Sequence, residues 1–250
     1  MRLYLLILTG ILSFASPSQA ESFRVAAAAD LQQAMPHLVA AFQQVYPQYE
    51  PQVTLGSSGV FSSQLRQGAP FQLFMSASSV YVEPLVAAGL TQDEGHIYAY
   101  GTLALVSRSP LHAESAQAAL AAWQAKTSRP RLALANPRHA PYGQAAQDWL
   151  LTQPKGQVLL NSAVLGENAA QAVQFVFSGA LEMGVLAWPL VQQRFPEASV
   201  WRIPPESHRL LDQRMVLMHS AGDAARAFYH FLQSKEARAI FQAQGFDWVP

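Results

Sequence analysis

The chain has 250 residues, of which 50% are hydrophobic and 13% charged, and its 16 Lys and Arg residues balance 16 Asp and Glu residues. This length is enough for one large domain or for two lobes with cores of their own. A chain without a basic excess is poorly suited to nucleic acid, because phosphate binding needs clustered positive charge. The lack of cysteine excludes disulfides, thiol catalysis and thiolate zinc sites.

The first 20 residues have the pattern of a secretory signal peptide. Arg2 supplies a positive charge, residues 3–14 are apolar, and Ser18 and Ala20 form a small-x-small cleavage pattern. The apolar run is shorter than the ~18–20 residues that span a bilayer, which favours a cleaved leader over a membrane anchor. We therefore predict cleavage after Ala20 and an exported protein, most simply a periplasmic one.

After this segment, short apolar runs alternate with segments of helical periodicity, which predicts an α/β fold with mostly parallel sheets. The predicted strands cover residues 23–28, 52–55, 71–75, 98–107, 131–135, 184–187, 199–203 and 214–219. The predicted helices cover residues 31–45, 60–66, 143–151, 169–178 and 221–244. Pro36 lies near the start of the first helix, so we expect an irregular first turn or a later start.

Four loops that follow strands are rich in small or hydroxyl residues and carry almost no cations. Their sequences are AAD (28–30), GSSG (56–59), APYG (140–143) and GENA (166–169). Loops of this kind at the start of a helix present backbone N–H groups to an anion, and ligands of open α/β sheets bind at this edge. Ordinary caps and tight turns explain any one of these loops alone. Four loops of the same kind favour a shared anion site.

Several stretches resemble one known family, in matching order and spacing from Arg24 to Phe246. These stretches are VAAAADL (25–31), GSSG (56–59), QLRQGAPFQLFMSA (64–77), YAYGTLALVS (98–107), NPRHAPYGQAA (136–146) and GENAAQAVQFVFSGALEMGVLA (166–187). The chain thereby resembles the molybdate-binding periplasmic proteins of ABC transporters. The resemblance implies a type II periplasmic-binding-protein fold, in which two α/β lobes close over molybdate or tungstate.

The family's function implies a carrier, not an enzyme. It would bind molybdenum only as the oxyanion, need no cofactor, act as a monomer and deliver its ligand to the permease of an ABC transporter in the inner membrane. From the strand order and the resemblance, we place lobe one at residues 21–103 and 201–250 and lobe two at residues 104–200.

The resemblance places ligand contacts at five positions. These are Asp30, Ser58, Tyr142, Ala169 and Ala187. Ser58 matches the hydroxyl contact of the family, whereas Tyr142 and Ala169 fall where the family uses the backbone. Ala187 aligns with a Tyr of some members, so this chain lacks that side-chain donor.

Asp30 departs most from the family, which has Ser or Asn at this contact. An ionised carboxylate repels a dianion, so Asp30 cannot simply replace a donor. Two interpretations stay open. We favour Asp30 as the N-cap of the following helix, with its own backbone N–H facing the ligand. The alternative is a protonated carboxyl, or a different ligand.

Two other functions compete with molybdate binding. The first is a type II receptor for another small oxyanion such as sulfate or phosphate. The second is an exported serine hydrolase that uses Ser58, although the sequence identifies no base to activate this hydroxyl and GSSG is not a nucleophile-elbow motif. The seven histidines show no HxxxH or HExxH spacing, which argues against a resident metal.

Overall fold

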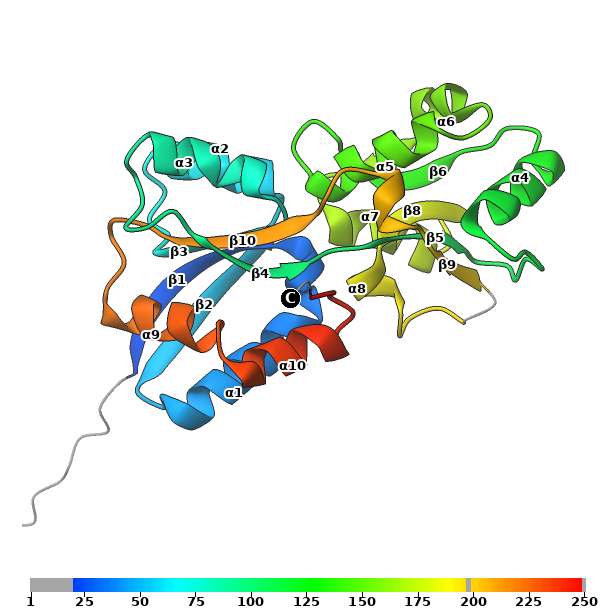
Figure 1. Cartoon of the computed structure of the whole chain (residues 1–250). Helices are drawn as coiled ribbons and strands as arrows, with labels where there is room; N and C mark the ends of the chain where they lie inside the picture. The colour runs from blue at the N-terminus through cyan, green and yellow to red at the C-terminus, as the bar shows by residue number, and fades with distance from the viewer. Residues whose placement is uncertain (1–19, 197–198, 249–250) are drawn as a thin grey trace, which may run out of the picture.

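The computed structural model describes residues 20–196 and 199–248. The predicted signal peptide lies outside these residues, apart from Ala20. Two five-stranded sheets organise the described chain, and each is covered by helices to form one of two adjoining lobes (Figure 1). The predicted α/β class with two lobes is therefore confirmed.

The first sheet combines strands from both ends of the chain. Its strands, in spatial order, are β2 (Tyr49–Gly56), β1 (Glu21–Ala28), β3 (Leu73–Ser76), β10 (Asp212–Leu217) and β4 (His96–Tyr100). One face packs against α1 (Ala34–Val45), α9 (Asp223–Phe231) and α10 (Lys235–Ala243), and the other against α2 (Ser58–Arg66) and α3 (Glu83–Ala87) (Figure 1).

The second sheet is built from the middle of the chain. Its strands, in spatial order, are β7 (Val164–Gly166), β6 (Leu132–Ala135), β8 (Met183–Ala187), β5 (Leu103–Ser107) and β9 (Val200–Arg202). Its helices are α4 (Ala116–Lys126), α5 (Pro141–Leu151), α6 (Gly156–Ser162), α7 (Ala169–Phe177) and α8 (Trp188–Val191).

Both sheets are mixed, so the prediction of mostly parallel sheets is wrong. β1 runs parallel to β2 and β3, and β6 runs parallel to β7 and β8. β10 runs antiparallel to both of its neighbours, as does β5 in the other sheet. The chain enters the second sheet at β5 and returns to the first sheet at β10. In each sheet, the strand that follows a crossing therefore runs opposite to its neighbours.

The chain crosses between the lobes twice. Residues 98–107, predicted as one strand, are divided between β4 and β5, with Gly101 and Thr102 between the two sheets. The return crossing leads from β9 to β10. The Gly101 N–H donates to the Leu211 carbonyl at 2.8 Å and so joins the two crossings. A continuous apolar run does not reveal that its halves pair in different sheets.

The lobe boundaries move slightly from those predicted. β9 pairs with β5, so Trp201 and Arg202, which we placed in lobe one, lie in the second sheet. That sheet begins at Leu103 and ends at Arg202, whereas the predicted lobe covered residues 104–200. The shift follows from strand pairing, which the sequence does not state.

Two helices also differ from their predicted form. α1 begins at Ala34, after a turn of 3-10 helix η1 (Ala29–Gln32), which agrees with the irregular start predicted from Pro36. The predicted helix over 221–244 is two helices. The Ser234 hydroxyl accepts a hydrogen bond from the Ala237 N–H at 3.1 Å and caps α10, so it starts a new helix.

Hydrophobic packing holds each lobe together and joins the two. Phe42 and Phe228 pack under the first sheet with ring centroids 4.8 Å apart, and Trp149 is fully buried in the second lobe. Ala28 ends β1 and Ala77 follows β3, both in the first sheet, yet they belong to the hydrophobic cluster of the second lobe. The two lobes are therefore in direct contact, and the structure is closed.

Gly143 provides a test of the packing at the start of α5. A Cβ at this position would lie 2.2 Å from the Ala135 carbonyl oxygen. Replacing Gly by Ala inside a helix ordinarily stabilises by about 1 kcal/mol, but here α5 would have to move away from β6. We expect Gly143→Ala to lower the free energy of unfolding by about 1–3 kcal/mol in urea denaturation.

Gln147→Ala, on the same helix with a partly exposed side chain, is the matched control and should change stability by no more than about 0.5 kcal/mol. A Gly143→Ala protein as stable as the wild type would contradict the close packing of α5 on β6.

Candidate ligand-binding site

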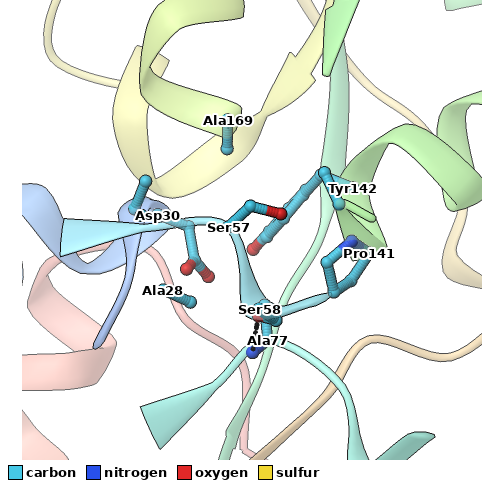
Figure 2. Close-up of a pocket in the computed structure, with 11 residues that line it drawn as sticks. Ala28, Asp30, Ser57, Ser58, Ala77, Pro141, Tyr142 and Ala169 are labelled. Atoms are coloured by element: carbon cyan, nitrogen blue, oxygen red, sulfur yellow. Dashed lines mark hydrogen bonds between the residues drawn. The ribbon is translucent and has the colours of Figure 1, made fainter. Parts of the chain in front are cut away.

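A small pocket lies where the two lobes meet (Figure 2). Its lining residues are Ala28, Ala29, Asp30, Gly56, Ser57, Ser58, Ala77, Ala140, Pro141, Tyr142 and Ala169. Its cavity volume is about 10 Å³, far below the range of about 300–1,000 Å³ that is typical of pockets for drug-sized ligands. The pocket therefore suits a small ion better than a nucleotide or a sugar.

Three α-helices begin at this pocket. α2 contributes Ser58, α5 contributes Pro141 and Tyr142, and α7 contributes Ala169, all within the first two positions of their helices. The N–H groups in the first turn of a helix have no partner within that helix, and they carry a partial positive charge. α2 belongs to one lobe, and α5 and α7 to the other, so both lobes present positive helix ends to the same space.

Ser58 lies at the bottom of the pocket as drawn in Figure 2 and is 1% exposed. Its hydroxyl oxygen accepts a hydrogen bond from the Ala77 N–H at 3.0 Å. Because the oxygen is the acceptor there, the hydroxyl proton is free to be donated to a ligand. This partner is a donor and not a base, so the contact does not provide the activation that a serine nucleophile needs.

Tyr142 reaches the pocket with its side chain as well as its backbone. Its hydroxyl oxygen lies 3.4 Å from the Gln213 Nε2, and a Cβ on Gly101 would lie 2.3 Å from this oxygen. Burial, and secondly the charge of Asp30, hold the pKa of the Tyr142 hydroxyl well above its usual range. The hydroxyl therefore stays protonated and links the second lobe to the crossing segments.

Asp30 lies in the pocket, but it is not the N-cap that we predicted. It is the second residue of η1, and the caps of η1 and α1 are Ala28 and Gln33, neither of which makes a side-chain capping bond. Asp30 Oδ2 accepts a hydrogen bond from the Gln213 Nε2 at 2.8 Å. The loop continues into a 3-10 turn, and this leaves the side chain pointing inward.

Burial raises the pKa of the Asp30 carboxyl from 3.8 to about 6, although the Tyr142 hydroxyl and the Gln213 amide oppose the shift. Figure 2 shows the carboxyl and the Tyr142 hydroxyl directed toward each other across the pocket. The pocket lining thus includes a carboxyl whose pKa is higher than that of an ordinary Asp.

The remaining predicted residues differ in position. Ala169 lines the pocket at the first position of α7. Ala187 ends β8 and is buried, but it is not part of the pocket lining. The structure thus brings four of the five predicted residues together in the pocket lining, namely Asp30, Ser58, Tyr142 and Ala169. Contact of all five residues with a ligand stays a prediction.

Sequence reasoning missed two groups that shape the site. Gln213 is fully buried in β10 and orients Asp30, but it stands between Asp212 and Arg214 in the sequence, which gives no signal that it is buried. Ser57 donates its hydroxyl to the His139 carbonyl at 2.6 Å, and the Gly59 N–H donates to the same oxygen at 2.9 Å. These two bonds connect the lobes beside the pocket, a contact between segments about 80 residues apart that no sequence motif reveals.

The pocket is uncharged apart from Asp30. Of the residues that the structure describes, those that line it include no Lys, Arg or His. No group of three His, Asp or Glu residues within 20–196 and 199–248 is arranged to hold a metal ion. Over the same residues, no helix is both long and apolar enough to cross a membrane.

Known proteins resemble this chain along most of its length. The profile of the bacterial extracellular solute-binding proteins matches residues 23–247. The molybdate-binding protein ModA of Azotobacter vinelandii is 30% identical over 250 residues, which cover 98% of this chain and 96% of that protein. ModA of Rhodobacter capsulatus is 31% identical over 194 residues, or 76% and 75% of the two chains.

A solved structure agrees with these matches. The periplasmic molybdate-binding protein of Azotobacter vinelandii superimposes with a TM-score of 0.81 at 25% identity, covering 91% of this chain and 100% of that one. The family resemblance and the type II fold that we predicted from the sequence are confirmed.

The raised pKa of Asp30 predicts an unusual dependence of stability on pH. A carboxyl with a pKa of 3.8 when unfolded and about 6 when folded favours folding fully below about pH 4, and this contribution is lost as the pH rises through about 6. Asp30→Asn cannot ionise. Without ligand, we expect its stability relative to wild type to rise between about pH 4 and 7, by at most about 3 kcal/mol.

Thermal denaturation across this pH range measures the difference. Asp223→Asn is the control, because the Asp223 side chain is 90% exposed and its replacement should leave the pH profile nearly unchanged. Equal profiles for wild type and Asp30→Asn would show that the carboxyl is not desolvated.

Proposed function

The chain belongs to the bacterial extracellular solute-binding proteins, and from this premise we propose that it captures molybdate for an ABC transporter. The observation that carries the proposal is the small pocket toward which neutral donors from both lobes converge. Relatives about 30% identical along most of the chain are molybdate-binding proteins, which supports this ligand over other oxyanions.

In the proposed complex, the ion replaces its hydration shell with hydroxyl and amide donors. Ser58 donates its hydroxyl proton, and the backbone N–H groups of Tyr142 and Ala169 donate from the starts of their helices. Hydrogen bonds to a charged group contribute about 1.5–3 kcal/mol each, so these three give roughly 4.5–9 kcal/mol, and about five would give roughly 8–15 kcal/mol. Micromolar to nanomolar binding needs about 8–12 kcal/mol, so the three donors approach the micromolar range without a cation, and tighter binding needs further donors in the pocket.

Closure of the lobes completes the site. We propose that residues 21–102 with 203–248 form one moving unit and residues 103–202 the other, because the chain passes between the sheets at these points. The bonds from Ser57 and Gly59 to the His139 carbonyl hold the closed arrangement. An ion that binds both units favours the closed state, which is the form that a permease would recognise.

The remaining features of the proposal follow from the family. The protein is exported, loses its leader after Ala20, works in the periplasm as a monomer, and delivers molybdate or tungstate to the permease. It acts by binding and not by catalysis, in agreement with its solute-binding relatives and with the donor that occupies the Ser58 hydroxyl oxygen.

Thermal denaturation in the presence of different oxyanions tests the function. A ligand at about 100 times its dissociation constant stabilises the folded state by about 2.7 kcal/mol, which for a chain of this size raises the melting temperature by about 5–10 °C. We expect this shift with molybdate and with tungstate, and a much smaller one with sulfate or phosphate at the same concentration. If only sulfate or only phosphate raised the melting temperature, that ion and not molybdate would be the ligand.

Ser58→Ala tests the donor set. Removing one hydrogen bond to a charged ligand should weaken molybdate binding about 10- to 100-fold in titration calorimetry. The buried Ala77 N–H also loses its acceptor, so we expect a loss of stability of about 1–3 kcal/mol. Ser63→Ala makes the same chemical change on α2 outside the pocket lining, and it should leave the affinity unchanged. Unaltered affinity in Ser58→Ala would remove this hydroxyl from the site.

A further inference from the structure

One oxygen of the Asp30 carboxyl has no partner of hydrogen-bonding geometry, although the Tyr142 hydroxyl and the backbone N–H groups of Asp30 and Leu31 lie close enough to the carboxyl to lower its pKa. The side chain is 1% exposed and lines the pocket, and its Oδ1 is buried without a hydrogen bond among the described residues. A buried polar atom without a partner is costly, so native structures retain one mainly where a ligand or a water completes it. Here that atom belongs to the pocket proposed to hold the oxyanion.

The neighbours of Asp30 decide which of its oxygens can carry a proton. The Tyr98 hydroxyl donates to the Gln213 Oε1 at 3.0 Å, and this leaves the Gln213 Nε2 to donate to Asp30 Oδ2 at 2.8 Å. Oδ2 is therefore an acceptor. If the carboxyl is neutral, its proton resides on Oδ1, the oxygen that is free for a ligand.

Among the described residues, no opposite charge contributes to the pKa of Asp30. Its pKa responds to burial and hydrogen bonds, and Tyr98 and Tyr142 are the titratable groups that interact with it. The elements packed against η1 add little: α7 and α8 have no ionisable residue, α1 has the exposed His37, and β2 has Tyr49 and Glu50 at its far end. The elements that carry Gln213, Tyr142 and Tyr98 also hold charged or titratable groups. Asp212 in β10 accepts from the Ser79 N–H, Arg214 in β10 donates to the Glu94 carbonyl, Asp148 in α5 pairs with Arg209, and β4 begins at His96. Arg194 lies beside the Gln33 amide, outside the pocket lining.

The size of the charge effect favours neutralisation. Two like unit charges about 4 Å apart near a protein surface repel enough to weaken association about 1,000-fold. The two charges of a dianion double this repulsion energy. Protonating a carboxyl whose pKa is about 6 costs only about 10-fold in affinity at pH 7. Binding to the neutral acid is thus far more favourable than binding beside the carboxylate.

We propose that Asp30 holds the oxyanion as a neutral carboxylic acid that donates the proton on Oδ1 to an oxygen of the ion, so that one proton is taken up with each ion captured. The inference rests on the oxyanion-binding function proposed above. The proton comes from a hydronium ion or a buffer acid in the solvent: its bond to that donor breaks, one O–H bond forms on the carboxylate, and the donor is left as water or as the buffer base. The carboxyl then acts as a donor, and capture becomes stronger as the medium becomes more acidic.

Titration calorimetry with molybdate tests the proposal on the wild-type protein. At about pH 8 the free carboxyl is ionised and molybdate is a dianion, so the observed heat in two buffers of different ionisation enthalpy reports the protons taken up. We expect close to one proton per ion. Between about pH 7 and 9 the dissociation constant should rise about 10-fold per pH unit.

Asp30→Asn provides the matched comparison, because an amide is similar in size and donates a hydrogen bond without a titratable proton. We expect it to fold, to bind molybdate with an affinity independent of pH, and to take up close to no protons. Asp223→Asn, an exposed carboxylate outside the pocket lining, should behave like wild type.

The outcomes separate the two proposals. Binding of molybdate by the wild type without proton uptake would overturn the role of Asp30 and leave the transport function standing. If the Asp30→Asn protein took up as many protons as the wild type, the proton would bind at another group, and the proposed role of Asp30 would also be overturned. Failure of molybdate to bind at any of these pH values would overturn the function itself. If Asp30→Asn does not fold, the two-buffer measurement on the wild type decides alone.

Discussion

A doubly negative ion can enter a protein cavity only if the cavity replaces the water that the ion loses. In the part of the chain that the structure describes, the pocket lining contains no cation for this purpose. The groups that could replace the water are the backbone N–H groups at the starts of α2, α5 and α7 and the Ser58 hydroxyl. Small side chains in the lining leave the backbone accessible. The pocket depends on these fixed dipoles, and its small residues follow from the need to bring the ion close to them.

The same constraint explains why the site lies between two lobes. One helix end supplies only about half an elementary charge, so several must converge on one point. The two sheets meet with the carboxyl ends of β1, β2 and β6 near the pocket, since each of these strands leads into a lining loop. Because Ser58 comes from one lobe and Tyr142 from the other, the complete donor set exists only when the lobes are closed.

Asp30 is the exception to this neutral design. The hydrogen bond from Gln213 and the contact between the lobes hold its carboxyl in a buried position, where it is 1% exposed. Such a group either destabilises the closed protein at neutral pH or gains a proton. In the proposed complex the ligand makes the second outcome favourable, so a residue that looks unsuited to an anion site becomes one of its donors.

Much of this protein was determined by its sequence alone. Alternating apolar runs and helical periods indicated the α/β class, Pro36 indicated the late start of α1, and the loop motifs indicated the family and four residues that line the pocket. These features are local or are carried by ordered motifs. Tertiary structure alone decided the division of residues 98–107 between two sheets and the inward orientation of Asp30. It also decided the role of Gln213, which lies 183 residues from its partner. Strand partners, burial and the pKa of a carboxyl depend on what surrounds a residue in space, and spacing along the chain does not contain that information.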